Sequence, residues 1–478
     1  MPKENKAGMP YRLDLFIAVI SLLFPWGWSV SGFPPSIELA CICWAVTLAC
    51  SLHYFWAWSK NKWRKTERWL VMIIVPVLVL TFSWRPVKNQ YHIQHSPSAL
   101  APTDPKVLAA VNGVGSNFNA LTSLLATNQF DTLKKSYASG FRIIKGKSRT
   151  IVEIFNPWQQ AHGISIKYNL VNKTVLNNYT SQGTFIHVPV KRAICMSTSY
   201  IAFLDVLGET SSIIGVSGSK YVNNPLLEKK IAAKEIYDVG YEQSLNYEML
   251  IKLKPDVLFA YGVGGEISGY INKLKELGIP VVLVGEYLET DPLAKAEWLK
   301  FFAEFYCKQN VAQNKFDTIA DQYLKLKKVA TTAKYNPSVI VDLPWNGSWH
   351  IAGGKSYIAK MIEDAGGNYL WKNDNSHETV PIDLEIVFHQ ALNSDFWMNI
   401  GNVNNKREIL AVDSRFKNLQ PFRTGKLYNN NARQNINGGN DYWESGAVNP
   451  QIILKDLIVI LHPELLSGQK LYYYKKIY

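Results

Sequence analysis

Two kinds of hydrophobic pattern divide this chain. Three long apolar runs occupy most of the first ninety residues, at about 15–33, 37–58 and 69–84, and tryptophans gather near their ends. Beyond residue 140, apolar residues come in short runs separated by amphipathic stretches. The first pattern predicts membrane-spanning helices with an aromatic belt, and the second predicts a folded α/β region outside the bilayer.

The distribution of basic residues predicts how the three runs are oriented. Three basic residues precede the first run, and the link 59–68 carries five against one acidic residue, whereas the link 31–36 carries none. By the positive-inside rule, the N-terminus and the second link lie in the cytoplasm and everything after Trp84 lies outside. Residues 1–90 are therefore interpreted as a membrane anchor in the inner, cytoplasmic membrane, which presents the rest of the chain to the periplasm or the outside of the cell.

The segment after the anchor is predicted to hold a folded domain away from the membrane. Residues 91–137 are polar and contain several prolines, which is typical of a stalk or linker. Residues 138–190 then contain two stretches of alternating apolar and polar residues, Ile151–Ile154 and Ile164–Tyr168. We expect a β element of two or three strands, which is too small to bury a core alone and must pack on the α/β region after it.

The remainder of the chain alternates between short apolar strands and helices. In residues 191–290 the pattern predicts four strands and intervening helices, and a second alternation fills 336–478. Between them, 291–335 is predicted to be helical with a break near 308–310, and its second half would be about 35 Å long. The predicted fold class is α/β: two Rossmann-like lobes with parallel sheets, joined by one long α-helix.

Composition narrows the choice of function. The 478 residues carry a net charge of +13, but no basic stripe follows one helix and no nucleic-acid motif occurs, so we expect no nucleic-acid partner. The five cysteines form no disulfide framework or metal-binding pair, and Cys41 and Cys50 lack the preceding residues of a lipid-attachment site. No Gly-x-Ser-x-Gly, Walker A or His-Glu-x-x-His motif occurs, so we predict neither catalytic residues nor a cofactor.

Several separate blocks of residues carry a family resemblance. Lys191–Gly218, Asn246–Val257 and Leu277–Val281 resemble helical-backbone periplasmic binding proteins, which serve ABC importers of cobalamin, iron-siderophores or haem. Five further blocks resemble the branch of this family found in Bacteroidetes: Gly285–Thr290, Asp364–Gly367, Tyr428–Asn431, Gly438–Gly446 and Leu461–Leu465. The resemblance covers about 70% of the chain, from Phe141 onward, and the three-run N-terminus departs from it.

The resemblance implies capture of a metal chelate outside the cytoplasm and its delivery to an ABC permease. Two alternatives stay open: a membrane-tethered sensor or scavenger of the same ligands, and a receptor for a molybdate-type oxyanion. An enzyme on the same scaffold is a third. The nine histidines are dispersed, so no site for a bare metal ion is predicted.

A bulky planar chelate requires flat aromatic walls and a few polar contacts. Strand ends and loops of the two lobes supply eight candidate ligand contacts, of which Arg433 and Ser199 are also the candidate donors to an oxyanion: Ser199, Tyr200, Tyr261, Tyr287, Trp345, Trp349, Arg433 and Trp443. Each aromatic residue could equally fill the core or the lobe interface. The glycine-rich segment 438–446 could likewise approach a ligand or form a structural turn.

Two acidic residues are expected to contact the permease. In the family that the sequence resembles, one acid on each lobe meets arginines of the importer. The matching positions are Glu248 and Glu385, each at the start of a predicted helix. An acid in the first turn also stabilises a helix through the helix dipole, which is the alternative explanation.

Overall fold

The computed structural model describes residues 131–133, 137–172, 184–262, 267–345 and 347–478. All of these belong to the second of two compact units, which are residues 1–108 and 109–478. The predicted membrane runs in residues 1–90 lie outside the described residues. Among the described residues, none of the helices has the length and apolar character needed to cross a bilayer.

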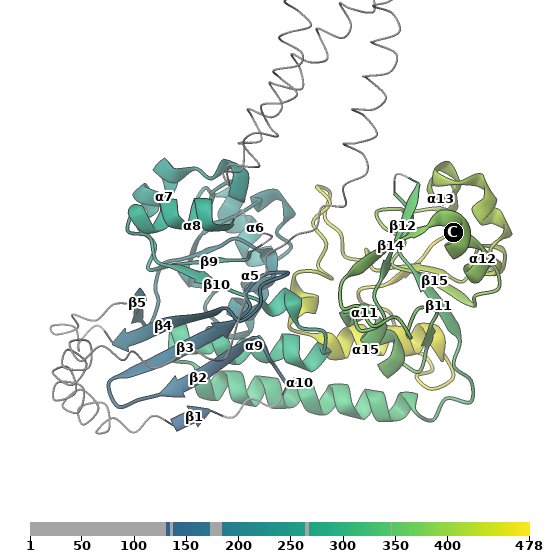
Figure 1. Cartoon of the computed structure of the whole chain (residues 1–478), viewed down its shortest axis with the longest axis horizontal. Helices are drawn as coiled ribbons and strands as arrows, with labels where there is room; N and C mark the ends of the chain where they lie inside the picture. Colours follow the sequence, from purple (N-terminus) through teal and green to yellow (C-terminus); the bar gives the residue numbers. More distant parts are fainter. Residues whose placement is uncertain (1–130, 134–136, 173–183, 263–266, 346) are drawn as a thin grey trace, which may run out of the picture. The chain divides into compact units, whose positions relative to one another are not determined.

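The β element is larger than the two or three strands expected. It is a five-stranded sheet in the order β1–β2–β3–β4–β5, antiparallel except between β4 and β5 (Figure 1). Its strands are β1 (Asp131–Leu133), β2 (Phe141–Lys145), β3 (Arg149–Phe155), β4 (Ser165–Asn172) and β5 (Thr184–Val188). The predicted number of strands was wrong because the first and last strands were missed. Strand β1 lies at the end of the polar segment interpreted as a stalk, and β5 shows no clear alternation of apolar and polar residues.

The N-terminal lobe contains a five-stranded parallel sheet in the order β10–β9–β6–β7–β8. Its strands are β6 (Ala193–Cys195), β7 (Ile213–Val216), β8 (Tyr237–Asp238), β9 (Val257–Ala260) and β10 (Val281–Leu283). Its helices are α5 (Thr198–Val206), α6 (Pro225–Ala232), α7 (Tyr247–Leu253) and α8 (Ile267–Glu276), with short 3-10 turns η2 (Thr210–Ser212), η3 (Ser219–Tyr221), η4 (Glu242–Ser244) and η5 (Glu286–Leu288). Helices therefore alternate with parallel strands as predicted, and side-chain caps at Ser197, Asn224 and Asn246 begin three of them.

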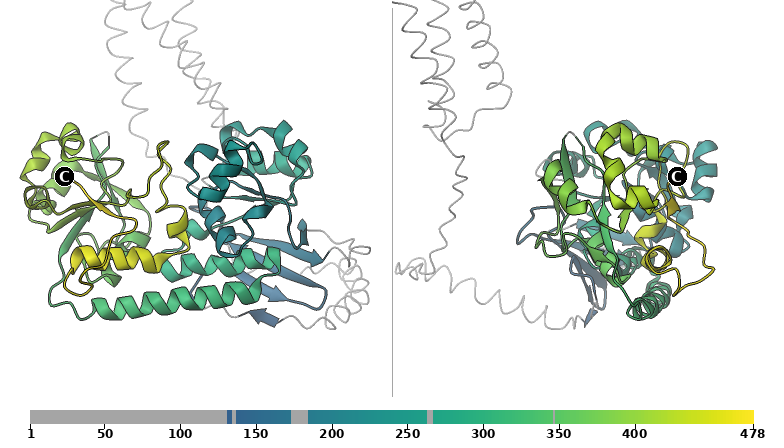
Figure 2. Two further views of the ribbon diagram at one scale, coloured as in Figure 1. Left: turned by 180° about the vertical axis from the view of Figure 1, so that it is seen from behind. Right: turned by 90° about the vertical axis from the view of Figure 1, so that its right-hand side faces the viewer.

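Two consecutive helices follow this lobe, and the predicted break between them is present. Helix α9 (Pro292–Tyr306) ends at Cys307, which adopts a left-handed conformation with φ of 55°, and α10 (Gln309–Ala330) begins two residues later. Figures 1 and 2 show α10 running alongside α9 and α15 (Pro450–Leu461). Helix α10 is thus the long helix that leads from one lobe into the other.

The C-terminal lobe has a sheet in the order β13–β11–β15–β16–β17, parallel except for β17. Its strands are β11 (Ser338–Val341), β13 (Asn368–Tyr369), β15 (Phe396–Met398), β16 (Leu427–Asn429) and β17 (Lys475–Lys476), and a separate antiparallel pair is formed by β12 (Ser348–Ala352) and β14 (Thr379–Asp383). The remaining helices before α15 are α11 (Tyr357–Asp364), α12 (Leu384–Ala391), α13 (Lys406–Val412) and α14 (Gln420–Thr424), with turns η6 (Ser414–Asn418) and η7 (Ser445–Ala447).

Helix α9 lies in the interior, with all but one of its fifteen residues buried. The β1–β5 sheet contacts it through Phe141, whose ring lies edge-on to Trp298 at 4.9 Å and to Phe301 at 5.7 Å. The chain just before β2 also contacts this side of the lobe: the backbone N–H groups of residues 137 and 138 donate to Glu297 and those of 139 and 140 to Glu289, at 2.8–2.9 Å.

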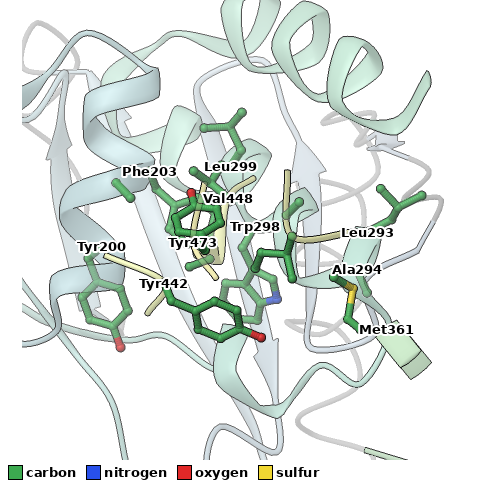
Figure 3. Close-up of a cluster of buried hydrophobic side chains, with 14 of the residues drawn as sticks. Tyr200, Phe203, Leu293, Ala294, Trp298, Leu299, Met361, Tyr442, Val448 and Tyr473 are labelled. Atoms are coloured by element: carbon green, nitrogen blue, oxygen red, sulfur yellow. The ribbon is translucent and has the colours of Figure 1, made fainter. Parts of the chain in front are cut away.

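One apolar core extends through both lobes. Buried side chains from each lobe belong to the same cluster, so the lobes are not separate globules joined by a bare linker. Figure 3 shows Tyr442, Val448 and Tyr473 of the C-terminal lobe grouped with Phe203 and Trp298 of the N-terminal half. Relative motion of the lobes must therefore be small or must open this shared packing.

Candidate functional site

The residues of interest follow the C-terminal ends of parallel strands, which is where open α/β sheets collect ligands. In the N-terminal lobe, Tyr261 follows β9 and Tyr287 follows β10, and both side chains are half-buried. The Tyr287 hydroxyl donates to the carbonyl of Gly262, next to Tyr261. Burial raises the pKa of each phenol to about 12, so both remain neutral hydrogen-bond donors. The structure brings these two predicted residues together.

A carboxyl group that the sequence analysis missed lies beside them. Glu242, in the short turn η4, is next to the Tyr261 hydroxyl, and burial raises the pKa of this carboxyl. The Tyr261 hydroxyl interacts with this carboxyl group, whereas its buried Oε1 atom has no hydrogen-bond partner among the described residues. Nothing in the sequence marks Glu242, because its burial depends on strands that are remote in the chain.

Ser199 and Tyr200 follow β6, and their surroundings differ. Ser199 lies in the first turn of α5 and its hydroxyl donates to Glu286 Oε1 at 2.7 Å. Tyr200 is completely buried, with its ring 5.7 Å from that of Phe302 on α9. The prediction of Tyr200 as a ligand contact is therefore wrong, because α5 turns this side chain toward the core and its hydroxyl lies 3.5 Å from the Val284 carbonyl.

A buried pair of opposite charges lies near Ser199 at the junction of the lobes. Glu286 is 3% exposed, and no partner of normal geometry among the described residues reaches its Oε2 atom. Burial raises the pKa of Glu286, and Lys295 on α9 partly offsets that shift. Burial likewise lowers the pKa of Lys295, whose Nζ lies 5.2 Å from the ring centre of Tyr357 on α11. These side chains therefore link the edge of the first sheet to the second lobe.

The corresponding edge of the C-terminal sheet carries two residues with a left-handed backbone. Val341 and Met398 are partners in the parallel β11–β15 pair, so the residues that follow them, Asp342 and Asn399, are neighbours. Both have positive φ, 67° for Asp342 and 52° for Asn399, a left-handed conformation that Asp and Asn adopt at lower cost than other non-glycine residues. Burial raises the pKa of Asp342 to about 7. Asn399 Oδ1 is buried without a partner among the described residues.

The indole groups of two tryptophans donate hydrogen bonds to backbone carbonyls at this edge of the sheet. Trp397 Nε1 donates to the Asp342 carbonyl at 2.7 Å, and Trp349 Nε1 donates to the Val341 carbonyl at 3.0 Å. Trp349 is completely buried against Trp397 and Phe416. The prediction that Trp349 forms a wall of the ligand site is therefore wrong: alternation along β12 directs Trp349 inward. Trp345, in contrast, is 69% exposed.

The glycine-rich segment connects the two lobes. Glu444, which is 2% exposed, accepts a hydrogen bond from the Asn223 backbone N–H at 2.8 Å, and burial raises its pKa to about 8. Asn435 Nδ2 donates to the carbonyls of Lys220 and Val222, both at 3.1 Å. A Cβ atom at Gly439 would lie 2.2 Å from the Tyr221 carbonyl, so only glycine permits this approach. We call residues 433–444 the strap.

Two predicted ligand contacts belong to the strap. Trp443 is 57% exposed and its ring lies edge-on to that of Tyr442 at 4.7 Å. Arg433 is already paired, because its Nε donates to Asp441 at 2.6 Å and its guanidinium lies 4.3 Å from the ring centre of Tyr472. Trp443 is therefore available to a ligand, whereas the charge of Arg433 is largely compensated inside the strap.

The two predicted docking acids both lie in first turns of helices at the surface. Glu248 is exposed on α7, whose cap Asn246 accepts from the Met249 N–H. Glu385 is exposed on α12 and forms an ion pair of 2.6 Å with Arg415, which also binds Asp413. No ion pair of Glu248 occurs within the described ranges. The two acids thus differ in how far their charge is compensated.

A shallow pocket lies away from these groups. It is lined by Thr184 of β5, Lys275 of α8 and the segment Gly278–Val281 that leads into β10. This is the edge at which strands begin, opposite the one that carries the tyrosines and carboxyl groups. We therefore do not assign it to the candidate site.

Known proteins resemble this chain in sequence and in structure. The family model described as periplasmic binding protein matches residues 194–429. An uncharacterized lipoprotein of Methanocaldococcus jannaschii is 31% identical over 300 residues, which is 61% of this chain and 70% of that protein. A second uncharacterized lipoprotein of the same organism is 26% identical over 392 residues, 77% of this chain and 96% of that protein. A solved periplasmic heme binding protein from Pseudomonas aeruginosa has a TM-score of 0.47 at 17% identity, over 60% of this chain and 98% of that one.

Proposed function

Because the chain belongs to the periplasmic binding protein family, we propose that it captures a metal chelate outside the cytoplasm and delivers it to an ABC permease. The chelate classes considered are cobalamin, ferric siderophores and haem. One observation carries the proposal: two α/β lobes, each built on a mainly parallel sheet, are joined by α10. Tyrosines, tryptophans and buried carboxyl groups follow the C-terminal ends of the strands in these sheets.

The proposed ligand contacts come from both lobes. Tyr261, Tyr287 and Ser199 belong to the N-terminal sheet edge, while Trp345 and Trp443 are exposed aromatic residues of the C-terminal lobe. Aromatic faces supply apolar contact area, and the phenol groups add directed hydrogen bonds. The continuous core, α10 and the strap favour capture with only a modest closure of the lobes.

Delivery requires recognition by the permease, for which we propose Glu248 and Glu385. An arginine of the permease would contact Glu248 directly. At Glu385 it would replace Arg415, and this exchange costs little because an exposed ion pair contributes about 1 kcal/mol or less.

We also propose that the chain is tethered to the membrane. The three apolar runs of residues 1–90 and the flanking basic residues support a cytoplasmic-membrane anchor with the binding lobes outside. The two Methanocaldococcus relatives are described as lipoproteins, which supports attachment of relatives to a membrane by another route.

The proposal is tested by purifying the full chain in detergent and recording its absorption spectrum and metal content. A co-purified corrinoid, haem or ferric chelate is the expected result. Titration of the emptied protein, followed by tryptophan fluorescence, should then give a Kd of about 1 µM or tighter for the chelate found, which corresponds to about −8 kcal/mol. A protein that binds no corrinoid, haem, ferric siderophore or oxyanion in either experiment would contradict the proposal.

A further inference from the structure

We propose that this receptor recognises its ligand through hydrogen-bond donors on the ligand, and that it takes a neutral chelate bearing amide N–H or hydroxyl groups. This inference rests on the proposed function and narrows it to a substrate class. It follows from side-chain oxygen atoms that receive no hydrogen bond from the described residues and that lie at the C-terminal edges of the two sheets. In the N-terminal lobe these oxygens belong to Glu242 and Glu286, and in the C-terminal lobe they belong to Asp342 and Asn399.

The N-terminal lobe supplies two of these groups. Glu242 Oε1 and Glu286 Oε2 are both buried, and within the described residues neither receives a hydrogen bond. A buried acceptor without a donor costs about 1–3 kcal/mol, so such groups are rare unless a ligand or water completes them. Glu242 lies near both Tyr261 and Tyr287, and Glu286 lies near Tyr287, so the sheet edge also offers aromatic surface.

The C-terminal lobe supplies the other two. Asp342 and Asn399 follow paired positions of β11 and β15, so their side chains start from adjacent backbone positions at one edge. Both residues are held at positive φ, and the indole bond from Trp397 to the Asp342 carbonyl stabilises that conformation. Non-glycine residues in this conformation are concentrated at ligand sites. Within the described residues the Asp342 carboxyl group receives no hydrogen bond, and burial is the one cause of its raised pKa.

The two lobes are connected through the charges at their junction. Lys295 lies close enough to Glu286 to affect its pKa, and its Nζ lies over the ring of Tyr357 in the other lobe. Tyr442 in turn is close enough to Asp342 for that carboxyl to raise its pKa. Among the described residues, Lys295 is the cation that affects Glu286, whereas Arg433 is paired with Asp441.

The unpartnered oxygens discriminate between ligand classes. A carboxylate-bearing chelate such as haem, or an oxyanion such as molybdate, would add further acceptor oxygens at a place where acceptors already lack donors. Amide and hydroxyl donors would instead complete the unpartnered oxygens, and an amide carbonyl could accept from Lys295. Corrinoids with peripheral carboxamides and peptide-based ferric hydroxamates have these groups.

The test is equilibrium binding to the detergent-purified full chain at one pH and salt concentration. Cyanocobalamin and ferrichrome represent the donor-bearing neutral chelates, haemin represents the carboxylates, and molybdate represents the oxyanions. We expect a donor-bearing chelate to bind at least tenfold more tightly than haemin or molybdate. Tighter binding of haemin or molybdate would overturn the inference while leaving the solute-binding function intact. Failure of all four to bind would instead count against the proposed function itself.

Variants of the carboxyl groups identify the cause. Glu286→Gln and Asp342→Asn each replace a carboxyl group, with two oxygen acceptors, by an amide with one, so each should weaken binding of the donor-bearing chelate by about tenfold. Glu363→Gln is the matched control, because Glu363 is an exposed acid of α11 outside the site. Unchanged or tighter chelate binding by both site variants, in proteins with wild-type circular dichroism, would overturn the inference.

Discussion

The carboxyl group of Glu444 accepts a hydrogen bond from the backbone N–H of Asn223 at 2.8 Å, although 221 residues separate the two. Glu444→Ala should leave this partly buried N–H without its partner and should lower the free energy of unfolding by about 1 kcal/mol. Glu444→Gln keeps an acceptor oxygen and should lose much less. Hydrogen exchange at the Asn223 amide checks this prediction: faster exchange is expected only in the alanine variant, and equal exchange in all three proteins would contradict it.

The pKa of Asp342, about 7 in the folded protein against 3.8 ordinarily, makes stability depend on pH. The folded state binds this proton more tightly, so stability falls as the pH rises from about 4 to about 7 and the loss is complete above pH 7. Three pKa units correspond to about 4 kcal/mol. Asp342→Asn should therefore raise Tm clearly at pH 8 and much less at pH 5. Asparagine also tolerates positive φ, so the backbone should not change.

Thermal unfolding of both proteins at the two pH values provides the measurement. A Tm difference of equal size at pH 5 and pH 8 would show that Asp342 does not titrate in this range. The Asp342→Asn variant should also bind the chelate more weakly. This is expected because the Asp342 carboxyl group destabilises the fold but contributes to ligand binding.

The exposed tryptophans should contribute affinity and little stability. Trp345→Ala and Trp443→Ala remove large apolar faces that are 69% and 57% exposed, so Tm should change by no more than a degree or two. Each should weaken chelate binding by about tenfold or more, as is common for aromatic anchors. Leu324→Ala on α10 is the control, since this side chain is exposed at 45% and lies on the connecting helix. Wild-type affinity in both tryptophan variants would remove them from the site.

Docking can be separated from capture by substitution of Glu248 and Glu385. Glu248→Ala together with Glu385→Ala should abolish uptake of the chelate by cells while its affinity for the purified protein stays unchanged. Arg415→Ala frees Glu385 from its ion pair and should leave uptake equal or faster. Radiolabelled chelate uptake measures both effects. Normal uptake by the double variant would favour a tethered sensor or scavenger over an importer component.

Much of the fold could be predicted because its elements are local. The apolar strands at Ala193–Cys195 and Ser338–Val341 appear as short-range patterns in the sequence, and the helix break predicted near 308–310 is found at Cys307. The membership of each side chain in the core could not be predicted in the same way. Tyr200 lies in the first turn of helix α5 and Trp349 in strand β12, where either face was possible, and packing against α9 and Trp397 decides their burial.

Part of the candidate site could be predicted, because some of its residues also follow local patterns in the sequence. Tyr261 and Tyr287 were found because they follow apolar strands, and the structure brings them together. Glu242 and Lys295 were missed because each stands in polar or amphipathic sequence, where an ionisable residue normally faces solvent. Their burial arises from long-range packing that has no local signal.

The contacts of the β1–β5 sheet with α9 determine how far the chain can be shortened. A version beginning at Lys191, close to where the family match starts, would turn the interior stripe of Trp298 and Phe301 into a surface prone to self-association. It would also remove the backbone amides that donate to Glu289 and Glu297, although Glu289 would keep the indole of Trp298 as a donor and Glu297 would keep its ion pair with Lys300. The smallest piece of this protein that can fold alone is therefore expected to be larger than residues 194–429, the segment that the family model matches.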